Sequence, residues 1–421
     1  MKQETKCLHA GYSPKNGEPR ALPIYQSTTF KYDSTNHIGK LFDLTAAGHF
    51  YSRLSNPTVE AVENKIAALE GGIAAMCTSS GQAASFTSLA TIMKAGEHFI
   101  STATIYGGTV NLFAVTMKRF GIECTFVDAD ASEEEIQKAF RPNTRAVFGE
   151  TLANPALTVC DIEKLARIAH KNGVPLIIDN TFPTPILCRP IEHGADIVIH
   201  STTKYMDGHA LCVGGVIVDS GKFDWTNGKF PEFTEPDESY HGTIYSKAFG
   251  PAAYIVKARV QLMRDLGMTP SANSAFLLNL GLETLAVRMP QYSRNGQKVA
   301  EFLSKHPKIE SISYPGLEGD KYHELAKKYL PDGCAGVMSI VIKGGRDGAA
   351  RFLDAFQLAT QCVHVADIRT CALHPATSTH RQLTDEQLAA CGIPQGLVRV
   401  SIGLENVDDI IADLSQALEK V

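Results

Sequence analysis

The segment "IVIHSTTKYMDGH", which begins at Ile197, places a lysine beside the end of an apolar run. The run predicts a buried strand, and Lys204 follows it among hydroxyl side chains, just before a glycine turn. A lysine is rarely placed so close to a core strand unless its amine has a partner. Lys204 is therefore the first candidate for chemistry.

Two further segments carry groups that could act together with this lysine. "LIIDNTF" ends an apolar run with Asp179, and "SSGQAA" puts Gly81 and Gln82 at the start of a helical pattern. Free backbone N–H groups at a helix start can bind a phosphate, although Ser-Ser-Gly is also an ordinary way to begin a helix. Ser201 and Thr203 add two hydroxyls next to the lysine. A phosphate near a lysine indicates either a nucleotide or pyridoxal phosphate.

The residue pattern favours pyridoxal phosphate over a nucleotide. Neither G-x-x-x-x-G-K-[ST] nor G-x-G-x-x-G follows an early predicted strand. Pyridoxal phosphate needs a lysine that forms a Schiff base and an acid that keeps the ring nitrogen protonated. Asp179 alone could equally cap a helix or form a turn, but together with Lys204 it favours the cofactor.

The elements that would hold these residues alternate between strand and helix from about residue 56 to residue 218. The helical pattern "DIEKLARIAHKNG" stops at Gly173, and the predicted strands are short and rich in β-formers: "HFIST", "CTFVDA", "RAVFGE", "VPLIIDN" and "DIVIHS". This alternation predicts an α/β fold, with a mostly parallel sheet and helices on both faces. Chemistry in such sheets gathers at the carboxyl ends of the strands, where Asp179 and Lys204 are expected.

The chain is long enough for more than one domain, and three parts are predicted. Residues 1–55 show no strong period and are expected to be an arm on another subunit, with a loose terminus as the alternative. Residues 56–259 form the large domain. Residues 260–421 form a smaller C-terminal α+β domain, because helical patterns there are followed by the predicted strands "IESISYP", "GVMSIVIKG" and "VRVSIGLE".

Composition excludes several functions. The 421 residues carry a formal net charge of −5 and no run of Lys or Arg, so neither nucleic acid nor an anionic membrane is expected as a partner. No apolar segment has membrane-spanning length, and the N-terminus lacks the apolar core of a signal peptide. The ten cysteines form no C-x-x-C pair, which indicates reduced thiols. We expect a cytoplasmic protein.

Several motifs together resemble a known family. They are "YSRLSNPT", "SSGQAA", "IYGGT", "ANP", "IIDNTF", "HSTTKYMDGH", "LHPATSTH" and "LVRVSIGLE", in the order and spacing of the Cys/Met-metabolism family of pyridoxal-phosphate enzymes. The resemblance covers nearly the whole chain. It implies the aminotransferase-like architecture called fold type I, and a homotetramer built from dimers with shared active sites.

The resemblance also implies roles for single residues. Lys204 matches the Schiff-base lysine, which also moves protons, and Asp179 matches the acid at the ring nitrogen. Tyr106 in "IYGGT" matches the tyrosine that stacks on the ring and can assist the leaving group; without the resemblance it would read as a core aromatic. The positions that match the phosphate site are Gly81, Gln82, Ser201 and Thr203.

Four more positions are carried over in the same way. Tyr51 and Arg53 match residues that reach the phosphate of a neighbouring subunit, and Tyr51 is also expected near the substrate. Arg399 matches the arginine that binds the substrate carboxylate with both guanidinium nitrogens; an arginine in a strand could also simply face water. Asn154 resembles the residue near the cofactor's ring oxygen and the substrate, or is a turn residue before Pro155.

The expected reaction is a γ-replacement, in which sulfide or a small thiol replaces the acetyl group of O-acetylhomoserine and gives homocysteine or methionine. The segment "FPEFTEPDESYHG", from Phe230 to Gly242, resembles an insertion of the O-acetylhomoserine sulfhydrylases and is expected to shape the mouth of the site. Gly108 stands where methionine γ-lyases carry a cysteine. The alternatives are a γ-lyase acting on methionine or cystathionine, and a cofactor-binding scaffold without turnover.

Two features of the C-terminal part stay open. Asp367, Ile368 and Arg369 depart from the family's pattern, and Arg369 could alter the accepted leaving group or thiol, or only pair with Asp367. His374 and His380 are close in sequence, but no carboxylate or cysteine pattern completes a metal site, so no metal is expected.

Overall fold

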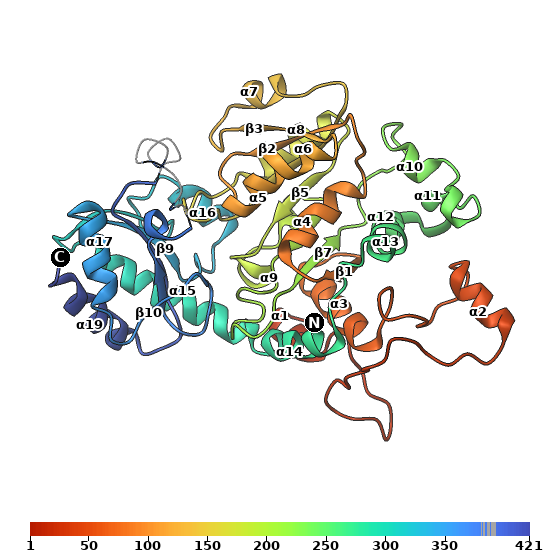
Figure 1. The fold of residues 1–421 in the computed structure, drawn as a ribbon, viewed down its shortest axis with the longest axis horizontal. Coiled ribbons are helices and arrows are strands. Elements are labelled where there is room, and N and C mark those ends of the chain that lie inside the picture. Colours follow the sequence, from red (N-terminus) through yellow and green to blue (C-terminus); the bar gives the residue numbers. More distant parts are fainter. Residues whose placement is uncertain (380, 382–383, 385–387, 389–392) are drawn as a thin grey trace.

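A computed structural model describes residues 1–379, 381, 384, 388 and 393–421. Figure 1 shows a large sheet at the centre of the molecule and a second sheet in the blue C-terminal part. A long red N-terminal segment extends away from both. No helix in the described part of the chain is long and apolar enough to cross a membrane.

The large sheet has seven strands in the order β1-β7-β6-β5-β4-β2-β3. All pairs are parallel except those of β7, which runs antiparallel to both β1 and β6. The strands are short and mostly buried: β1 (Ala74–Thr78), β2 (His98–Thr102), β3 (Glu123–Val127), β4 (Thr144–Glu150), β5 (Leu176–Asp179), β6 (Ile197–His200) and β7 (Gly215–Asp219). The predicted α/β class and mostly parallel sheet are confirmed.

The helices around this sheet begin and end where local chemistry predicts. α3 (Pro57–Glu70) has Asn56 as its N-cap and ends at Gly71, whose left-handed backbone suits glycine. α8 (Ile162–Lys171) buries one apolar face and is capped by Asp161. The other helices of this part are α4 (Gly81–Ala90), α5 (Gly107–Asn111), α6 (Met117–Arg119), α7 (Glu133–Lys138), α9 (Thr184–Leu187), α10 (Pro231–Thr234), α11 (Tyr245–Phe249), α12 (Ala253–Lys257) and α13 (Arg264–Leu266).

The second sheet has five strands in the order β10-β11-β12-β9-β8. Only β10 and β11 are parallel. Its strands are β8 (Ile309–Ser313), β9 (Val337–Ile342), β10 (Thr360–Gln361), β11 (Cys371–Leu373) and β12 (Leu397–Ser401). The helices that the structure describes in full after residue 270 are α14 (Ala272–Glu283), α15 (Leu285–Ser304), α16 (His323–Tyr329), α17 (Gly345–Asp354) and α19 (Val407–Leu418). The three strands predicted for this part are β8, β9 and β12.

The first residues are not loose. In α1 (Gln3–His9), Cys7 is fully buried and the Lys6 ammonium donates to the carbonyl of Ala68 at 2.8 Å. After α1 the chain leaves the body of the molecule through α2 (Thr35–Phe42) (Figure 1). The sequence predicted neither helix, because elements of seven and eight residues are too short to show a period.

Candidate active site

A cavity of about 260 Å³ lies at the carboxyl ends of the strands of the large sheet. It adjoins a more open hollow of about 670 Å³ that shares Tyr106, Asn154 and Arg399 with it. Most residues that the sequence predicted for the site line the cavity: Gly81, Gln82, Tyr106, Asn154, Asp179, Ser201, Thr203, Lys204 and Arg399. The structure thus brings together residues from both sheets.

Lys204 lies in the turn after β6, and its backbone N–H donates to the carbonyl of Ser201 at 3.3 Å. Burial, and after it the positive charge of Arg399, lower the pKa of its amine to about 8. No described residue forms a hydrogen bond or an ion pair with Lys204 Nζ. The amine is therefore free to bond to a ligand, and part of it is neutral near pH 8.

Asp179 ends β5 with its carboxyl group in the cavity. Its Oδ1 accepts from the Thr181 hydroxyl at 2.5 Å and from the Thr181 N–H at 3.0 Å. Burial raises the pKa of this carboxyl, while the Thr181 hydrogen bonds and the nearby His200 lower it. A buried carboxyl of this kind is suited to pair with a cationic ring nitrogen.

The start of α4 forms one wall of the cavity. The side chain of Ser80 caps the helix by accepting from the Ala83 N–H at 3.0 Å, which leaves the first N–H groups, those of Gly81 and Gln82, without a helical partner. A Cβ on Gly81 would lie 2.6 Å from the Cβ of Ser201, so only glycine permits this close approach. The arrangement is an anion site made of backbone N–H groups and hydroxyls.

Thr203 completes this wall and is held in place by backbone contacts. Its hydroxyl accepts from the Gly214 N–H at 3.0 Å and lies 3.2 Å from the Gly214 carbonyl. The link ties the turn that carries Lys204 to the segment that leads into β7. The lysine and the anion site are thereby fixed relative to each other.

Tyr106 precedes α5, and its exposed ring lines both hollows. Its backbone N–H donates to Oε2 of Glu150 at 2.7 Å. A Cβ on Gly108 would lie 2.6 Å from Cε1 of Tyr106 and 2.8 Å from Nε2 of Gln82. A side chain at position 108 would therefore displace the tyrosine ring.

Arg399 reaches the cavity from β12 and is 9% exposed. Its NH1 donates to Oδ1 of Asn154 at 3.3 Å, and its NH2 donates to the carbonyls of Val363 at 3.1 Å and His364 at 3.2 Å. Among the residues that the structure describes, no Asp or Glu pairs with this guanidinium. A buried cation without a carboxylate partner is suited to bind an anionic ligand.

Tyr51 and Arg53 do not line the cavity of their own chain. Both are exposed, and the Arg53 guanidinium lies 5.2 Å from the centre of the Tyr51 ring. They lie between α2 and α3, shortly before α3 begins at Pro57. Their predicted contact with a neighbouring subunit stays a prediction.

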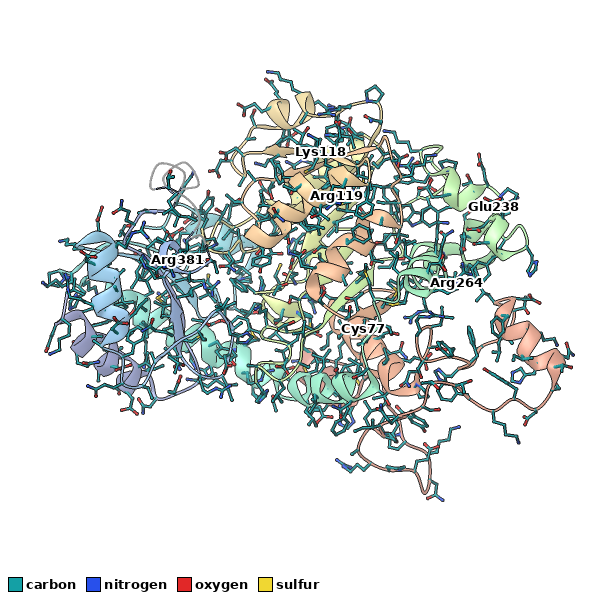
Figure 2. All side chains as sticks on the ribbon, in the orientation of Figure 1. Cys77, Lys118, Arg119, Glu238, Arg264 and Arg381 are labelled. Atoms are coloured by element: carbon teal, nitrogen blue, oxygen red, sulfur yellow. The ribbon has the colours of Figure 1, made fainter. Side chains whose placement is uncertain are left out.

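The Phe230–Gly242 segment does not reach the cavity of its own chain, so its predicted place at the mouth of the site stays a prediction for an assembled enzyme. None of its residues lines the cavity. Arg145, at the opposite end of β4 from Glu150, pairs with Glu232 and lies 4.4 Å above the Phe230 ring. Figure 2 shows Glu238 at the outer edge of the molecule, far from the cavity. An insertion's anchor residue, here Arg145, cannot be recognised from the sequence.

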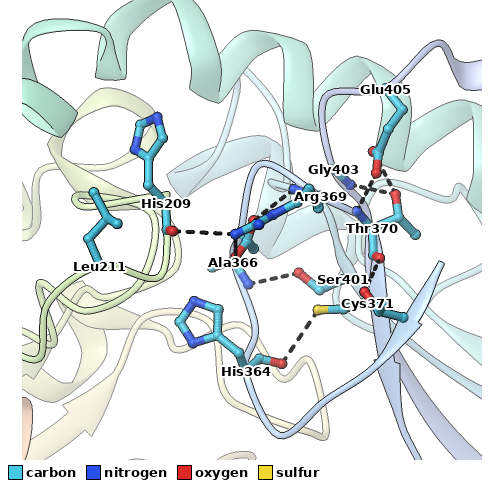
Figure 3. Close-up of polar contacts among 12 residues, drawn as sticks. His209, Leu211, His364, Ala366, Arg369, Thr370, Cys371, Ser401, Gly403 and Glu405 are labelled. Carbon is cyan, nitrogen blue, oxygen red and sulfur yellow. Dashed lines mark hydrogen bonds and ion pairs between the residues drawn. The ribbon is translucent and has the colours of Figure 1, made fainter. Parts of the chain in front are cut away.

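The departure at residues 367–369 forms an internal ion pair. Arg369 donates to both carboxylate oxygens of Asp367, at 2.9 and 3.0 Å, and to the carbonyl of His209 at 3.3 Å (Figure 3). Its side chain is 63% exposed and does not line the cavity. Of the two alternatives, the structure supports the pairing with Asp367.

Of the two histidines that stand close in sequence, only His374 is among the described residues. His374 is buried, with Nε2 2.6 Å from the Gln395 carbonyl and Nδ1 3.0 Å from the Thr377 hydroxyl. His380 lies outside the described residues. No cluster of three or more His, Cys, Asp or Glu side chains that could hold a metal occurs within the described ranges.

Sequence reasoning missed Glu150, which is buried at the end of β4 and lines the cavity. The register of β4 and β5 places it opposite Asp179. Burial raises the pKa of Glu150 well above its usual range, and the charge of Asp179 raises it further. The sequence did contain a signal for Glu150. It ends the predicted strand that precedes the strand of Asp179, and neighbouring parallel strands place their carboxyl ends side by side.

The donor set of the cavity fits pyridoxal phosphate. The open N-terminus of α4 with two neighbouring hydroxyls fits the phosphate, and the close approach of Gly81 to Ser201 leaves this wall free of a side chain. The unpartnered amine of Lys204 fits the aldehyde carbon, and the buried carboxyl of Asp179 fits the ring nitrogen.

Comparison with known proteins agrees with this fit. Residues 4–419 match the Cys/Met metabolism PLP-dependent enzyme family. The chain is 45% identical over 431 aligned positions to "O-acetyl-L-homoserine sulfhydrylase" of Leptospira meyeri, covering 100% of this chain and 97% of the relative. It is 47% identical over 420 positions to "Homocysteine synthase" of Schizosaccharomyces pombe, covering 99% and 98%.

One solved structure is especially similar. It is a Campylobacter jejuni protein proposed to be an O-acetylhomoserine (thiol)-lyase, and it contains N'-pyridoxyl-lysine-5'-monophosphate. The two chains superpose with a TM-score of 0.96 at 38% identity, and each is covered completely.

Proposed function

Since the chain belongs to the Cys/Met-metabolism family of pyridoxal-phosphate-dependent enzymes, we propose that it is an O-acetylhomoserine sulfhydrylase. It replaces the acetyl group of O-acetylhomoserine with sulfide or a small thiol and gives homocysteine or methionine. Full-length relatives at 45% and 47% identity carry the names of this activity. Pyridoxal phosphate is the cofactor.

The observation that carries the proposal is that two cations, Lys204 and Arg399, line the same cavity. Neither cation has a carboxylate partner among the described residues, and the charge of Arg399 is felt at Lys204. A free amino acid supplies the missing anion to Arg399 and presents its α-carbon to the amine. The site is therefore built for an amino-acid substrate with a free carboxylate.

Each residue then has a physical task. The bound cofactor withdraws electrons from the substrate's α-carbon, which makes the α-proton and then the β-proton acidic. Lys204, with its pKa lowered to about 8, accepts a proton and returns it near neutral pH. Asp179 keeps the ring nitrogen protonated through its negative charge. The N–H groups of Gly81 and Gln82 and the hydroxyls of Ser201 and Thr203 hold the phosphate.

Tyr106 and Asn154 orient the reacting groups. The ring of Tyr106 lines the cavity beside Gly108; it would stack on the bound cofactor, and its hydroxyl would assist the departure of acetate. Asn154 accepts a hydrogen bond from Arg399 through its side-chain oxygen and would also contact the cofactor's ring oxygen. A γ-lyase acting on methionine or cystathionine is the alternative reaction, and a scaffold without turnover is disfavoured by the complete set of residues.

We also propose that the active enzyme is a homotetramer built from dimers, in which Tyr51 and Arg53 reach the phosphate of the neighbouring subunit and Tyr51 also lies near the substrate. Exposed apolar side chains support this. They occur on the N-terminal segment and around the cavity mouth: Tyr25, Phe42, Tyr51, Leu211, Val213 and Val363. The same proposal divides the chain into the arm 1–55, the large domain 56–259 and the C-terminal domain 260–421.

A cytoplasmic location belongs to the same proposal. The nine cysteines that the structure describes are all free thiols, which suits a reducing compartment.

The test compares three reactions of the purified holoenzyme. O-acetylhomoserine with sulfide should give homocysteine much faster than O-acetylhomoserine alone gives 2-oxobutyrate, and methionine alone should react poorly. O-succinylhomoserine with sulfide measures the preference for the acyl group. Rapid release of 2-oxobutyrate and methanethiol from methionine would replace the sulfhydrylase with the lyase.

A further inference from the structure

Two thiols lie next to each other beside Arg399, outside the set of residues that the proposed reaction uses. Cys371 begins β11, and Cys362 directly follows β10. In the parallel register of these strands Thr360 stands opposite Cys371, and the Cys362 N–H donates to the Ala372 carbonyl at 3.2 Å. Because side chains two residues apart share a face of a strand, Cys362 lies one diagonal step from Cys371 on the same face.

The contacts of the two sulfur atoms make them chemically different. The Cys371 thiol lies 3.5 Å from the His364 carbonyl, as Figure 3 shows, and close enough to the Cys362 sulfur for each thiol to shift the pKa of the other. The contact with Cys371, together with the His364 N–H and the charge of Arg399, lowers the pKa of Cys362 to about 6. The same contact and burial raise the pKa of Cys371 far above its usual value.

The two thiols also differ in solvent exposure, and the more acidic one is the more accessible. Cys362 is partly exposed, whereas Cys371 is 2% exposed. A dissolved oxidant therefore meets Cys362 first, in its reactive thiolate form, and Cys371 waits beside it as a protonated thiol. This is the arrangement of an attacking thiol with a second thiol that resolves its oxidised product.

We propose that Cys362 and Cys371 are an oxidative modification site that forms an intramolecular disulfide with a peroxide. The Cys362 thiolate attacks one peroxide oxygen, the O–O bond breaks, and the leaving hydroxide takes a proton to become water. The Cys371 sulfur then attacks the resulting sulfenic acid of Cys362, and the S–S bond forms as the S–O bond breaks. The second hydroxide leaves as water with the proton of Cys371. One peroxide is thus reduced as two thiols are oxidised, and an external dithiol restores the pair.

The disulfide changes the backbone next to Arg399. A diagonal step between neighbouring strands separates the Cα atoms by roughly 8 Å, whereas a disulfide holds them about 5.5–6 Å apart. Cys371 is fixed, because β11 also pairs with β12. The 362–364 segment must therefore move, and its carbonyls at Val363 and His364 are the acceptors of Arg399 NH2.

The functional effect, which rests on the proposed function, is that Arg399 binds the substrate carboxylate more weakly. The KM for O-acetylhomoserine should rise at least severalfold on oxidation. The KM for sulfide and the cofactor absorbance should stay unchanged, because Lys204 and Asp179 lie on the other sheet. A dithiol reductant should restore the original KM.

The test maps the disulfide directly and does not depend on the activity. The folded holoenzyme is treated with a small excess of hydrogen peroxide, free thiols are alkylated, and a tryptic digest is analysed by mass spectrometry. Trypsin cuts after Arg369, so Cys362 and Cys371 fall in separate peptides, from Phe352 to Arg369 and starting at Thr370. The expected product is this peptide pair joined by a disulfide, which separates on reduction.

Three variants sharpen the test. C362S and C371S should each abolish the joined peptide and the rise of KM, and peroxide on C371S should leave a sulfenic acid on Cys362 that a dimedone probe traps. C124S is the matched control, because Cys124 is also partly exposed but burial raises its pKa to about 12. It should respond to peroxide like the unaltered protein. If the joined peptide appears only after denaturation, or Cys362 is alkylated as fully after peroxide as before it, the proposal is wrong.

Discussion

Glu150 and Asp179 stand opposite each other in the register of β4 and β5, so two carboxyl groups share one edge of the large sheet. Burial raises the pKa of both, and the charge of Asp179 acts on Glu150 as well. Since two neighbouring carboxyls resist ionising together, one must keep its proton. Both carboxyls accept hydrogen bonds, but only Asp179 has a nearby cation, His200, that favours its charged form, whereas Glu150 faces the negative charge of Asp179. We therefore expect Glu150 to be the protonated member.

The first prediction follows from this difference. Glu150→Gln should keep the acceptor for the Tyr106 N–H and retain most of the activity, because the glutamate is already neutral. Asp179→Asn should retain the fold and the cofactor but lower kcat by about 10²-fold or more, because the charge at the ring nitrogen is lost. Steady-state kinetics and cofactor absorbance measure both. Equal losses in the two variants would contradict the assignment of the proton.

The second prediction concerns the pH dependence of Lys204. The pKa of its amine is lowered to about 8, so the neutral fraction grows as the pH rises through 8. The rate at which the apoenzyme takes up pyridoxal phosphate should rise over the same interval, because only the neutral amine attacks the aldehyde. Stopped-flow absorbance gives this rate. A midpoint near the usual lysine value of 10.5 would show that burial does not act on this amine.

The third prediction compares two arginines of the C-terminal part. Arg399 lines the cavity, whereas Arg369 is exposed and pairs with Asp367. Arg399→Ala should lower kcat/KM for O-acetylhomoserine by about 10²-fold or more, since charge-assisted hydrogen bonds to the carboxylate are lost. The KM for sulfide should change little. Arg369→Ala, the matched control, removes an exposed pair with Asp367 and should leave kcat/KM within about threefold. Similar losses in both variants would argue against carboxylate binding by Arg399.

The fourth prediction tests the shared site. Arg53→Ala and Lys204→Ala chains should each be inactive. Mixing them under conditions of subunit exchange should restore part of the activity, because a mixed dimer rebuilds one complete site. Differently tagged chains recovered together by affinity purification confirm the exchange. Mixed dimers without activity would place Arg53 outside its neighbour's site.

The fifth prediction concerns the insertion, which is anchored to the large domain through the Arg145–Glu232 ion pair. Glu232→Ala leaves the mostly buried Arg145 with Glu97, at 3.6 Å, as its carboxylate partner and should lower the free energy of unfolding by about 2 kcal/mol. The ratio of homocysteine to 2-oxobutyrate should stay constant. Glu238→Ala, at an exposed position of the same insertion, is the control and should change neither quantity. A shift in the product ratio would return the insertion to the active site of an assembled enzyme.

Sequence reasoning worked where a local signal carried the information. The strands of the large sheet were predicted because short β-rich runs alternate with an amphipathic helix such as α8, and the strand ends then placed Asp179 and Lys204 together. Tyr106, Arg399 and Asn154 could not be found in this way. Each looks ordinary in its own segment, and only the fold brings them to one cavity. The resemblance to a family supplied what local patterns lacked.

Other features could not be predicted for the same reason: they depend on contacts between residues far apart in sequence or on strand register. The contact of Glu232 with Arg145 joins residues that are far apart in sequence and carry no pattern, so the sequence could not predict where the insertion is anchored. The pairing of Cys362 with Cys371 depends on the register of two very short strands, β10 and β11, which no periodicity reveals.

The antiparallel strand β7 also determines when the large sheet can form during synthesis of the chain. In the described sheet β1 pairs only with β7, so Ala74 must wait for Asp219 to leave the ribosome. Until then β1 offers an unpaired edge, which favours aggregation and chaperone binding. The start of α4 follows β1, and Lys204 lies between β6 and β7, so the two halves of the phosphate and amine site meet only when β7 inserts. A nascent chain should therefore bind its cofactor only after β7 has joined the sheet. In cells short of pyridoxal phosphate, we expect β7 to be the first strand to detach from the sheet.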